Sequence, residues 1–116
     1  MTFNFYEKKI KLRNKNFHLK FWDNSGNTIY SSLIVPFYKK AKISLIFYDA
    51  LDRDSFEAAK LYFKDIKKKS EIVNHIFILV RNKYENILNI NANNDIVDDE
   101  EALEYADKNG LYFFIL

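Results

Sequence analysis

The first part of the chain alternates apolar and polar positions. Ile10 and Leu12 alternate with lysines, and after a polar turn over residues 13–16 three more apolar positions alternate with polar ones. These three are Phe17, Leu19 and Phe21. A period of two places every second side chain on the same face of a strand. The pattern therefore predicts a β-hairpin with one buried face.

Apolar runs without alternation follow further along the chain. Residues 43–48 and 76–80 are almost entirely apolar, which is typical of parallel strands covered on both faces. Residues 111–116 form a last apolar run, which predicts one more strand.

Two stretches with helical spacing separate these runs. Apolar residues recur at helical intervals after residues 52–55, which offer N-cap side chains. A second helix is predicted to begin with the acidic residues 98–101 and to stop at Asn109-Gly110. Residues 27–40 contain Pro36, so any helix there is short, irregular or begins near this proline. The Asn-rich residues 86–94 are predicted to form a loop. A hairpin followed by helix–strand units predicts an α/β domain with a mostly parallel sheet.

The length and composition of the chain exclude several classes of function. A length of 116 residues corresponds to one domain over 1–116, and the formal charge of +2 gives no support for a nucleic-acid partner. The absence of cysteine excludes disulfides, zinc–thiolate sites and thiol catalysis, and it fits a reducing compartment. No apolar run approaches the roughly 20 residues of a membrane helix. We therefore expect a cytoplasmic protein.

Several short motifs occur in an order and at spacings similar to those of small GTPases. The strand ending at Trp22 is followed by Asp23-Asn24-Ser25-Gly26-Asn27, and the next strand ends in Tyr48-Asp49 before Asp52-Arg53-Asp54-Ser55-Phe56. Asn82-Lys83-Tyr84-Glu85 follows a further strand, and residues 97–114 resemble the family's Val-x-x-x-Glu-Ala segment that ends in Phe-x-Phe. Together they resemble the second half of a Ras-superfamily GTPase, closest to the Rab branch. The resemblance implies a truncated P-loop GTPase-like α/β fold, in which an antiparallel hairpin precedes the parallel strands and helices lie on the sheet faces.

The resemblance carries five residues over as a vestigial nucleotide site. In the family, the positions of Asp23 and Gly26 serve the magnesium shell and the γ-phosphate, while the next position is a glutamine that orients the attacking water. Here that position is Asn27, which is one methylene shorter. An alternative interpretation is that Asp23 and Gly26 now serve only the turn after their strand.

The other three residues match the motif that selects guanine. The positions of Asn82 and Lys83 brace the base loop and pack on the base, and Glu85 stands where the family has an aspartate that accepts two hydrogen bonds from guanine. The longer side chain of Glu85 implies some loss of recognition. Alternatively, the three residues are an inherited loop cap.

The phosphate-binding half of the motif set is missing from this sequence. No Gly-x-x-x-x-Gly-Lys occurs, and the two glycines are Gly26 and Gly110. In the family, P-loop amides, their lysine and the magnesium ion provide most of the nucleotide affinity. We therefore expect no resident cofactor, GTP or GDP with magnesium bound weakly if at all, and no hydrolysis, no catalytic residue and no metal site.

The missing strand predicts exposed sheet edges and an exposed apolar face. In the family, that strand lies between the strands that end at Asp23 and Asp49. Either residues 17–22 pair directly with residues 43–48, or another chain inserts a strand. An uncovered face with Phe and Ile side chains favours a protein partner or self-association, for example a strand-swapped homodimer. The chain ends without the cysteines that anchor Rab proteins, so no membrane anchor of that kind is expected.

Three hypotheses for function follow. The chain is a Rab-like, non-catalytic interaction module related to vesicle traffic, with an effector-type surface on the hairpin and on residues 27–38. Alternatively, it is a fragment of a GTP-binding small GTPase, or a structural subunit of a larger complex. The histidines His18 and His75 lack metal-ligand spacing, and the serines at 31, 32 and 55 lack a partner histidine at a meaningful spacing. Neither group predicts an additional active site.

Overall fold

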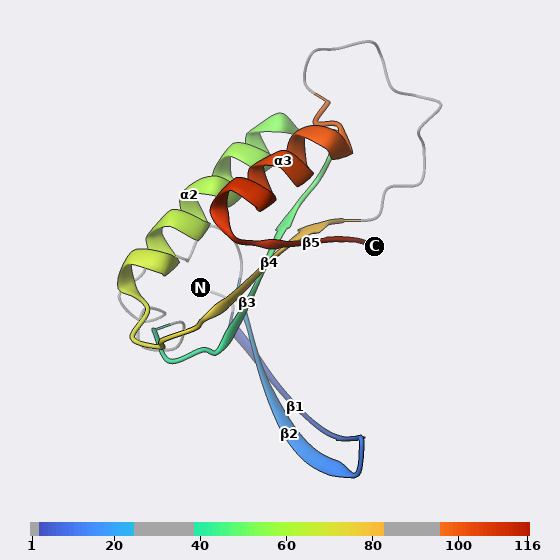
Figure 1. Ribbon diagram of the computed structural model, residues 1–116, viewed down its shortest axis with the longest axis vertical. Helices are drawn as coiled ribbons and strands as arrows, with labels where there is room; N and C mark the ends of the chain where they lie inside the picture. Colours follow the sequence, from blue (N-terminus) through green and yellow to red (C-terminus); the bar gives the residue numbers. More distant parts are fainter. Residues whose placement is uncertain (1–2, 25–38, 83–95) are drawn as a thin grey trace. The chain divides into compact units, whose positions relative to one another are not determined.

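The computed structural model describes residues 3–24, 39–82 and 96–116. The chain divides into two compact units, Met1–Phe37 and Tyr38–Leu116, which are described separately. Among the described residues, the first unit contains a two-stranded sheet, and the second contains a three-stranded sheet with two helices (Figure 1). Residues 27–38 of the predicted irregular segment 27–40 lie outside the described residues, as does the predicted loop at 86–94. The expectation of one domain over 1–116 stays a prediction.

The first unit is the predicted hairpin. Strands β1 (Phe3–Leu12) and β2 (Lys15–Asn24) pair antiparallel. Arg13 and Asn14 connect them with φ of 50° and 65°. Two central residues with positive φ are the mark of a type I′ turn, whose twist matches that of the flanking strands. The turn is therefore tighter than the predicted residues 13–16, because Lys15 and Asn16 already belong to β2.

The hairpin keeps the predicted alternation but does not bury its apolar face. Ile10 pairs with Phe17, and Tyr6 pairs with Phe21, so these side chains share one face. Phe17 and Phe21 are each 42% exposed. The prediction of a buried face is wrong for these residues, because two strands alone provide no second layer within the described part of their unit.

The second unit is built on a parallel sheet, as predicted. Strands β3 (Ile43–Tyr48), β4 (Ile76–Arg81) and β5 (Tyr112–Ile115) lie in the order β3-β4-β5. Both pairs are parallel, with Leu45 opposite Ile78 and Ile78 opposite Tyr112. Among the described strands, β3 therefore lies at one edge of its sheet, and a direct pairing between residues 17–22 and 43–48 is not among the observed pairings.

Two helices cover one face of this sheet. Helices α2 (Arg53–Lys69) and α3 (Asp99–Asn109) lie side by side on it (Figure 1). Phe63 of α2 meets Phe77 of β4 edge to face, with ring centroids 4.9 Å apart, and Phe56 meets Tyr48 of β3 at 5.1 Å. Such edge-to-face pairs add to the stabilisation from buried area. The buried side chains of α2 are Phe56, Ala59, Phe63 and Ile66.

Side chains and backbone geometry define the helix ends where the sequence predicted them. Asp52 caps α2 by accepting from the Asp54 amide, and Asp98 caps α3 by accepting from the Glu101 amide. Gly110 ends α3 with φ of 75°, in the left-handed region that favours glycine. Lys67, Lys68 and Lys69 fill the last turn of α2, where positive charge is favoured by the helix dipole.

The opposite face of the three-stranded sheet is open among the described residues. On β3, Ile46 and Tyr48 are buried, whereas Ile43, Leu45 and Phe47 are 52%, 49% and 50% exposed. The prediction of cover on both faces is wrong for β3, because both described helices lie on one side, whereas on β4 the opposite-facing Val80 is buried at 4% exposure. The predicted exposure of Phe and Ile side chains on the other side is confirmed. Neither described helix is long and apolar enough to cross a membrane.

Candidate functional site

The carboxyl ends of β3, β4 and β5 form one edge of the second unit. Parallel strands end on the same side, and ligands of open α/β sheets bind outside these carboxyl ends. Asn82 follows β4 directly, and its amide donates to the Tyr48 carbonyl at 2.8 Å. Leu116 follows β5, and its amide donates to the Arg81 carbonyl at 3.1 Å. The backbone thus holds Asn82 beside the end of β3.

Asp49, the first residue after β3, organises a turn at this edge. Its carboxylate accepts from the Leu51 amide at 2.9 Å, and its own amide donates to the Ser55 hydroxyl at 2.9 Å. The Ser55 hydroxyl lies 2.7 Å from the Asp52 carbonyl. These bonds satisfy the backbone between β3 and α2, so Asp49 and Ser55 have a local structural role.

Two arginines fix the beginning of α3 against this edge. Arg81 Nη1 donates to both carboxylate oxygens of Asp99, at 2.7 and 2.8 Å. Arg53 donates to the two carboxylate oxygens of Glu101 at 2.9 and 2.8 Å, and to the Ile96 carbonyl at 3.1 Å. The hydrogen bond from Arg53 lowers the pKa of Glu101, although partial burial opposes it. Charged two-point contacts of this kind are strong and geometrically specific.

A second polar cluster lies at the opposite, amino-terminal end of the sheet. His75 Nε2 is 2.7 Å from the Ser44 hydroxyl, and His75 Nδ1 is 2.8 Å from the Ser70 hydroxyl. The ring stacks on Phe77 with a centroid distance of 4.2 Å. Burial lowers the pKa of His75. In its neutral form the ring donates to one serine and accepts from the other, so the cluster ties β3, the end of α2 and the start of β4 together.

Sequence reasoning missed this Ser44–His75–Ser70 cluster. It tested the histidines for metal spacing and three other serines for a partner, whereas the contacts arise from residues 31 and 5 positions apart. No local sequence motif indicates such a cluster, because the register between strands β3 and β4 brings these residues together. Within the ranges that the structure describes, no group of three or more His, Cys, Asp or Glu side chains forms a metal-binding cluster.

The structure places two of the five predicted nucleotide-site residues. Asp23 lies near the end of β2, opposite Asn4, and is exposed. Asn82 is exposed at the carboxyl edge of the three-stranded sheet. The two belong to different units, so their separation stays untested. Gly26, Lys83 and Glu85 lie outside the described residues, as does Asn27.

Comparisons of the sequence with known proteins match nearly the whole chain. The sequence profile described as "Ras family" matches residues 1–115. The chain is 34% identical to "Ras-related protein Rab-2B" of Dictyostelium discoideum over 110 residues, which are 95% of this chain and 52% of that protein. It is 30% identical to "Ras-related protein RHN1" of Nicotiana plumbaginifolia over 109 residues, 94% of this chain and 52% of that protein. The chain thus spans about half the length of the curated relatives it matches.

Proposed function

This chain belongs to the Ras family, and we propose that it is a Rab-like interaction module that binds protein and does not hydrolyse GTP. In this proposal the module is related to vesicle or membrane traffic and is cytoplasmic, in keeping with its likeness to Rab proteins. Asp23, Gly26, Asn82, Lys83 and Glu85 are the remnant of a nucleotide site.

The observation that carries the proposal is the lack of a phosphate cradle in these 116 residues. A nucleotide tail is held by a ring of backbone amides and a lysine, which needs a glycine-rich loop before a helix. The two glycines of this chain are Gly26 and the helix cap Gly110. Asn27 in place of glutamine removes the group that would orient the attacking water.

The charged groups near Asn82 support the same conclusion. The described cations closest along the chain to this edge, Arg53 and Arg81, are bonded to the carboxylates of Glu101 and Asp99. A guanidinium held by two carboxylate oxygens has little remaining positive field for a phosphate. These arginines therefore stabilise the fold and do not replace a P-loop lysine.

The hairpin offers a surface for a protein partner. Phe5 and Trp22 face each other across the two strands with ring centroids 4.3 Å apart, and they are 42% and 41% exposed. Exposed aromatic side chains are enriched in protein interfaces. This supports the hairpin as one part of the effector-type surface of the module; the other proposed part, residues 27–38, lies outside the described residues.

Titration of fluorescent GDP, GTP and guanosine with magnesium tests the proposal. Without a phosphate cradle, we expect affinities no better than micromolar, with GDP and guanosine bound alike. Any residual binding should fall in Asn82→Ala and persist in the control variant Asn16→Ala, which changes an exposed asparagine of the hairpin. Nanomolar affinity, or GDP binding more than about tenfold tighter than guanosine (about 1.4 kcal/mol), would contradict the proposal.

A second candidate is that the chain is part of a GTP-binding small GTPase. The observation in its favour is the coverage of 52% of the length of the Rab-2B relative. Sequencing of transcripts decides between the two. A message with an in-frame Gly-x-x-x-x-Gly-Lys segment joined to residue 1 would favour this candidate. A structural subunit of a larger complex is a third candidate, and a stable complex isolated with the native protein would favour it.

A further inference from the structure

The open face of the three-stranded sheet is continuous and apolar. We use this name for the side chains of β3, β4 and β5 that point away from α2 and α3. The strand register places them in rows, with Leu45 opposite Ile78 and Ile78 opposite Tyr112. The members are Ile43, Leu45, Phe47, Ile76, Ile78, Tyr112 and Phe114, together with Val80, which their neighbours leave only 4% exposed. None of them is charged.

The open face is large for a single copy of a small protein. Besides the β3 members, Ile76, Tyr112 and Phe114 are 41%, 67% and 56% exposed. Because a large aromatic side chain has roughly 150–250 Å² of surface and Leu or Ile slightly less, these fractions leave about 600 Å² exposed. The largest apolar patch of a typical monomer is about 300–600 Å², and patches at the upper limit are often interfaces.

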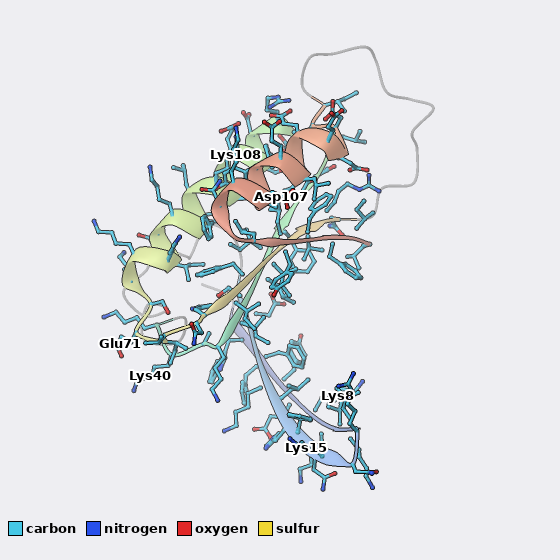
Figure 2. The ribbon with its side chains drawn as sticks, in the orientation of Figure 1. Lys8, Lys15, Lys40, Glu71, Asp107 and Lys108 are labelled. Carbon is cyan, nitrogen blue, oxygen red and sulfur yellow. The ribbon has the colours of Figure 1, made fainter. Side chains whose placement is uncertain are left out.

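The charged residues of this unit that the structure describes are not members of the open face. Asp107 and Lys108 project from α3 (Figure 2) and are exposed. The ion pairs of Arg53 with Glu101 and of Arg81 with Asp99 lie at helix and strand ends. An uncharged face cannot select a partner by charge, but it is compatible with an identical face. Two like faces brought together neither repel each other nor bury an unpaired charge.

We propose that the open face is the contact between two copies of this chain. The sheets pack face to face about 10 Å apart, as in a β-sandwich, so that the interface is twofold symmetric. Burying the face in both copies removes about 1,200 Å² from water, which is at the lower limit of stable, specific interfaces. The dimer is therefore concentration-dependent. Tyr112, the first residue of β5, is 67% exposed, which places this polar side chain at the rim of the face.

Size-exclusion chromatography of the full chain with light scattering tests for the dimer. We expect twice the chain mass at high concentration and a shift towards the monomer on dilution. Leu45→Lys places a charge in the middle of β3 on the open face and should abolish the dimer. The matched control Leu61→Lys changes an exposed leucine of α2, 58% exposed, and should leave the dimer intact. Far-ultraviolet circular dichroism verifies that both variants fold.

Maleimide labelling locates the interface, because the chain has no cysteine of its own. In the dimer, Leu45→Cys should react at least about tenfold more slowly than Leu61→Cys and reach its rate on dilution. A monomer in which both cysteines react equally would overturn the proposal. So would a monomer in which the cysteine at position 45 is protected, since another segment of the chain then covers the face. A dimer in which it reacts freely uses another surface and also overturns the proposal.

The outcome of these dimer experiments is independent of the nucleotide titration. The variants at positions 45 and 61 do not touch Asn82 or Asp23, so loss of the dimer leaves the proposed module untested by this route. Conversely, tight GDP binding would refute that module without affecting the mass of the chain.

Discussion

His75 shows what single residues contribute when the fold brings them together. Its ring lies within hydrogen-bond distance of Ser44 and Ser70 and stacks on Phe77. Burial lowers its pKa from the usual 6.5. Protonation places a positive charge on a partly buried ring, and the lost solvation of this charge is the reason for the lowered pKa.

This arrangement predicts a loss of stability in acid. An unfolded chain takes up a proton on this histidine near pH 6.5, whereas the folded chain does so at lower pH. Between these two values the unfolded state binds more protons, so the free energy of unfolding decreases as the pH falls below 6.5 and levels off below the folded pKa. Denaturant titrations from pH 8 to 5 should show this decrease in the native chain and a smaller one in His75→Gln.

The other histidine provides the control for this experiment. His18 lies in the hairpin, where its Nε2 is 2.8 Å from a Glu7 carboxylate oxygen. His18→Gln should keep the pH-dependent loss assigned to His75. Equal slopes in the native chain and in His75→Gln would show that the cluster does not contribute to the acid dependence.

At the scale of elements, the helix ends follow rules that can be recognised in the sequence. Asp52 and Asp98 supply side-chain acceptors for orphan amides at the two N-termini, and Gly110 supplies the left-handed residue after α3. The sequence predicted an N-cap within residues 52–55, a helix beginning with the acidic residues 98–101 and a stop at Asn109-Gly110, because helix ends depend on a few neighbouring residues. The type I′ turn at Arg13-Asn14 was less predictable, since neither residue is a glycine.

The contribution of Gly110 to the free energy of unfolding can be measured directly. A Cβ added there would meet no atom within 4 Å, so the effect of Gly110→Ala is conformational and not steric. A non-glycine residue with positive φ costs about 1 kcal/mol or slightly more, and we expect that decrease in the free energy of unfolding by urea. Gly110→Asn should cost less, because asparagine tolerates this region. Equal stability of all three proteins would contradict the role given to the cap.

At the scale of the whole molecule, the described core is confined to the second unit. Every described hydrophobic residue that is fully buried lies between Ile46 and Leu111. The hairpin has exposed aromatic side chains and no described buried residue. An isolated two-stranded hairpin is marginally stable in water, so stability should differ between the two units.

Hydrogen exchange on the full chain should reveal this difference. We expect the slowest amides in β4, which has neighbours on both sides, and in the buried turns of α2. The amides of β1 and β2 should exchange faster than those of β4 by at least two orders of magnitude, corresponding to about 2.7 kcal/mol. Equal protection of both units would show that they open together and would support one domain over 1–116.

The sequence by itself determined the local features of this protein. The hairpin, three parallel strands, two helices and their caps follow from periodicity and from residues close together in the chain. The motif order around Asp23, Asn82 and residues 97–114 likewise indicated the family, because order and spacing are properties of the chain.

Only the tertiary structure decided what these elements cover and which distant residues meet. The continuous apolar runs could not show that α2 and α3 share one face of the sheet. Such a run occurs in a strand whether helices cover one face or both. The Ser44–His75–Ser70 cluster and the two arginine–carboxylate contacts depend on strand register and helix packing. These non-local geometries result from burying the whole apolar surface at once, and no short segment of sequence encodes them.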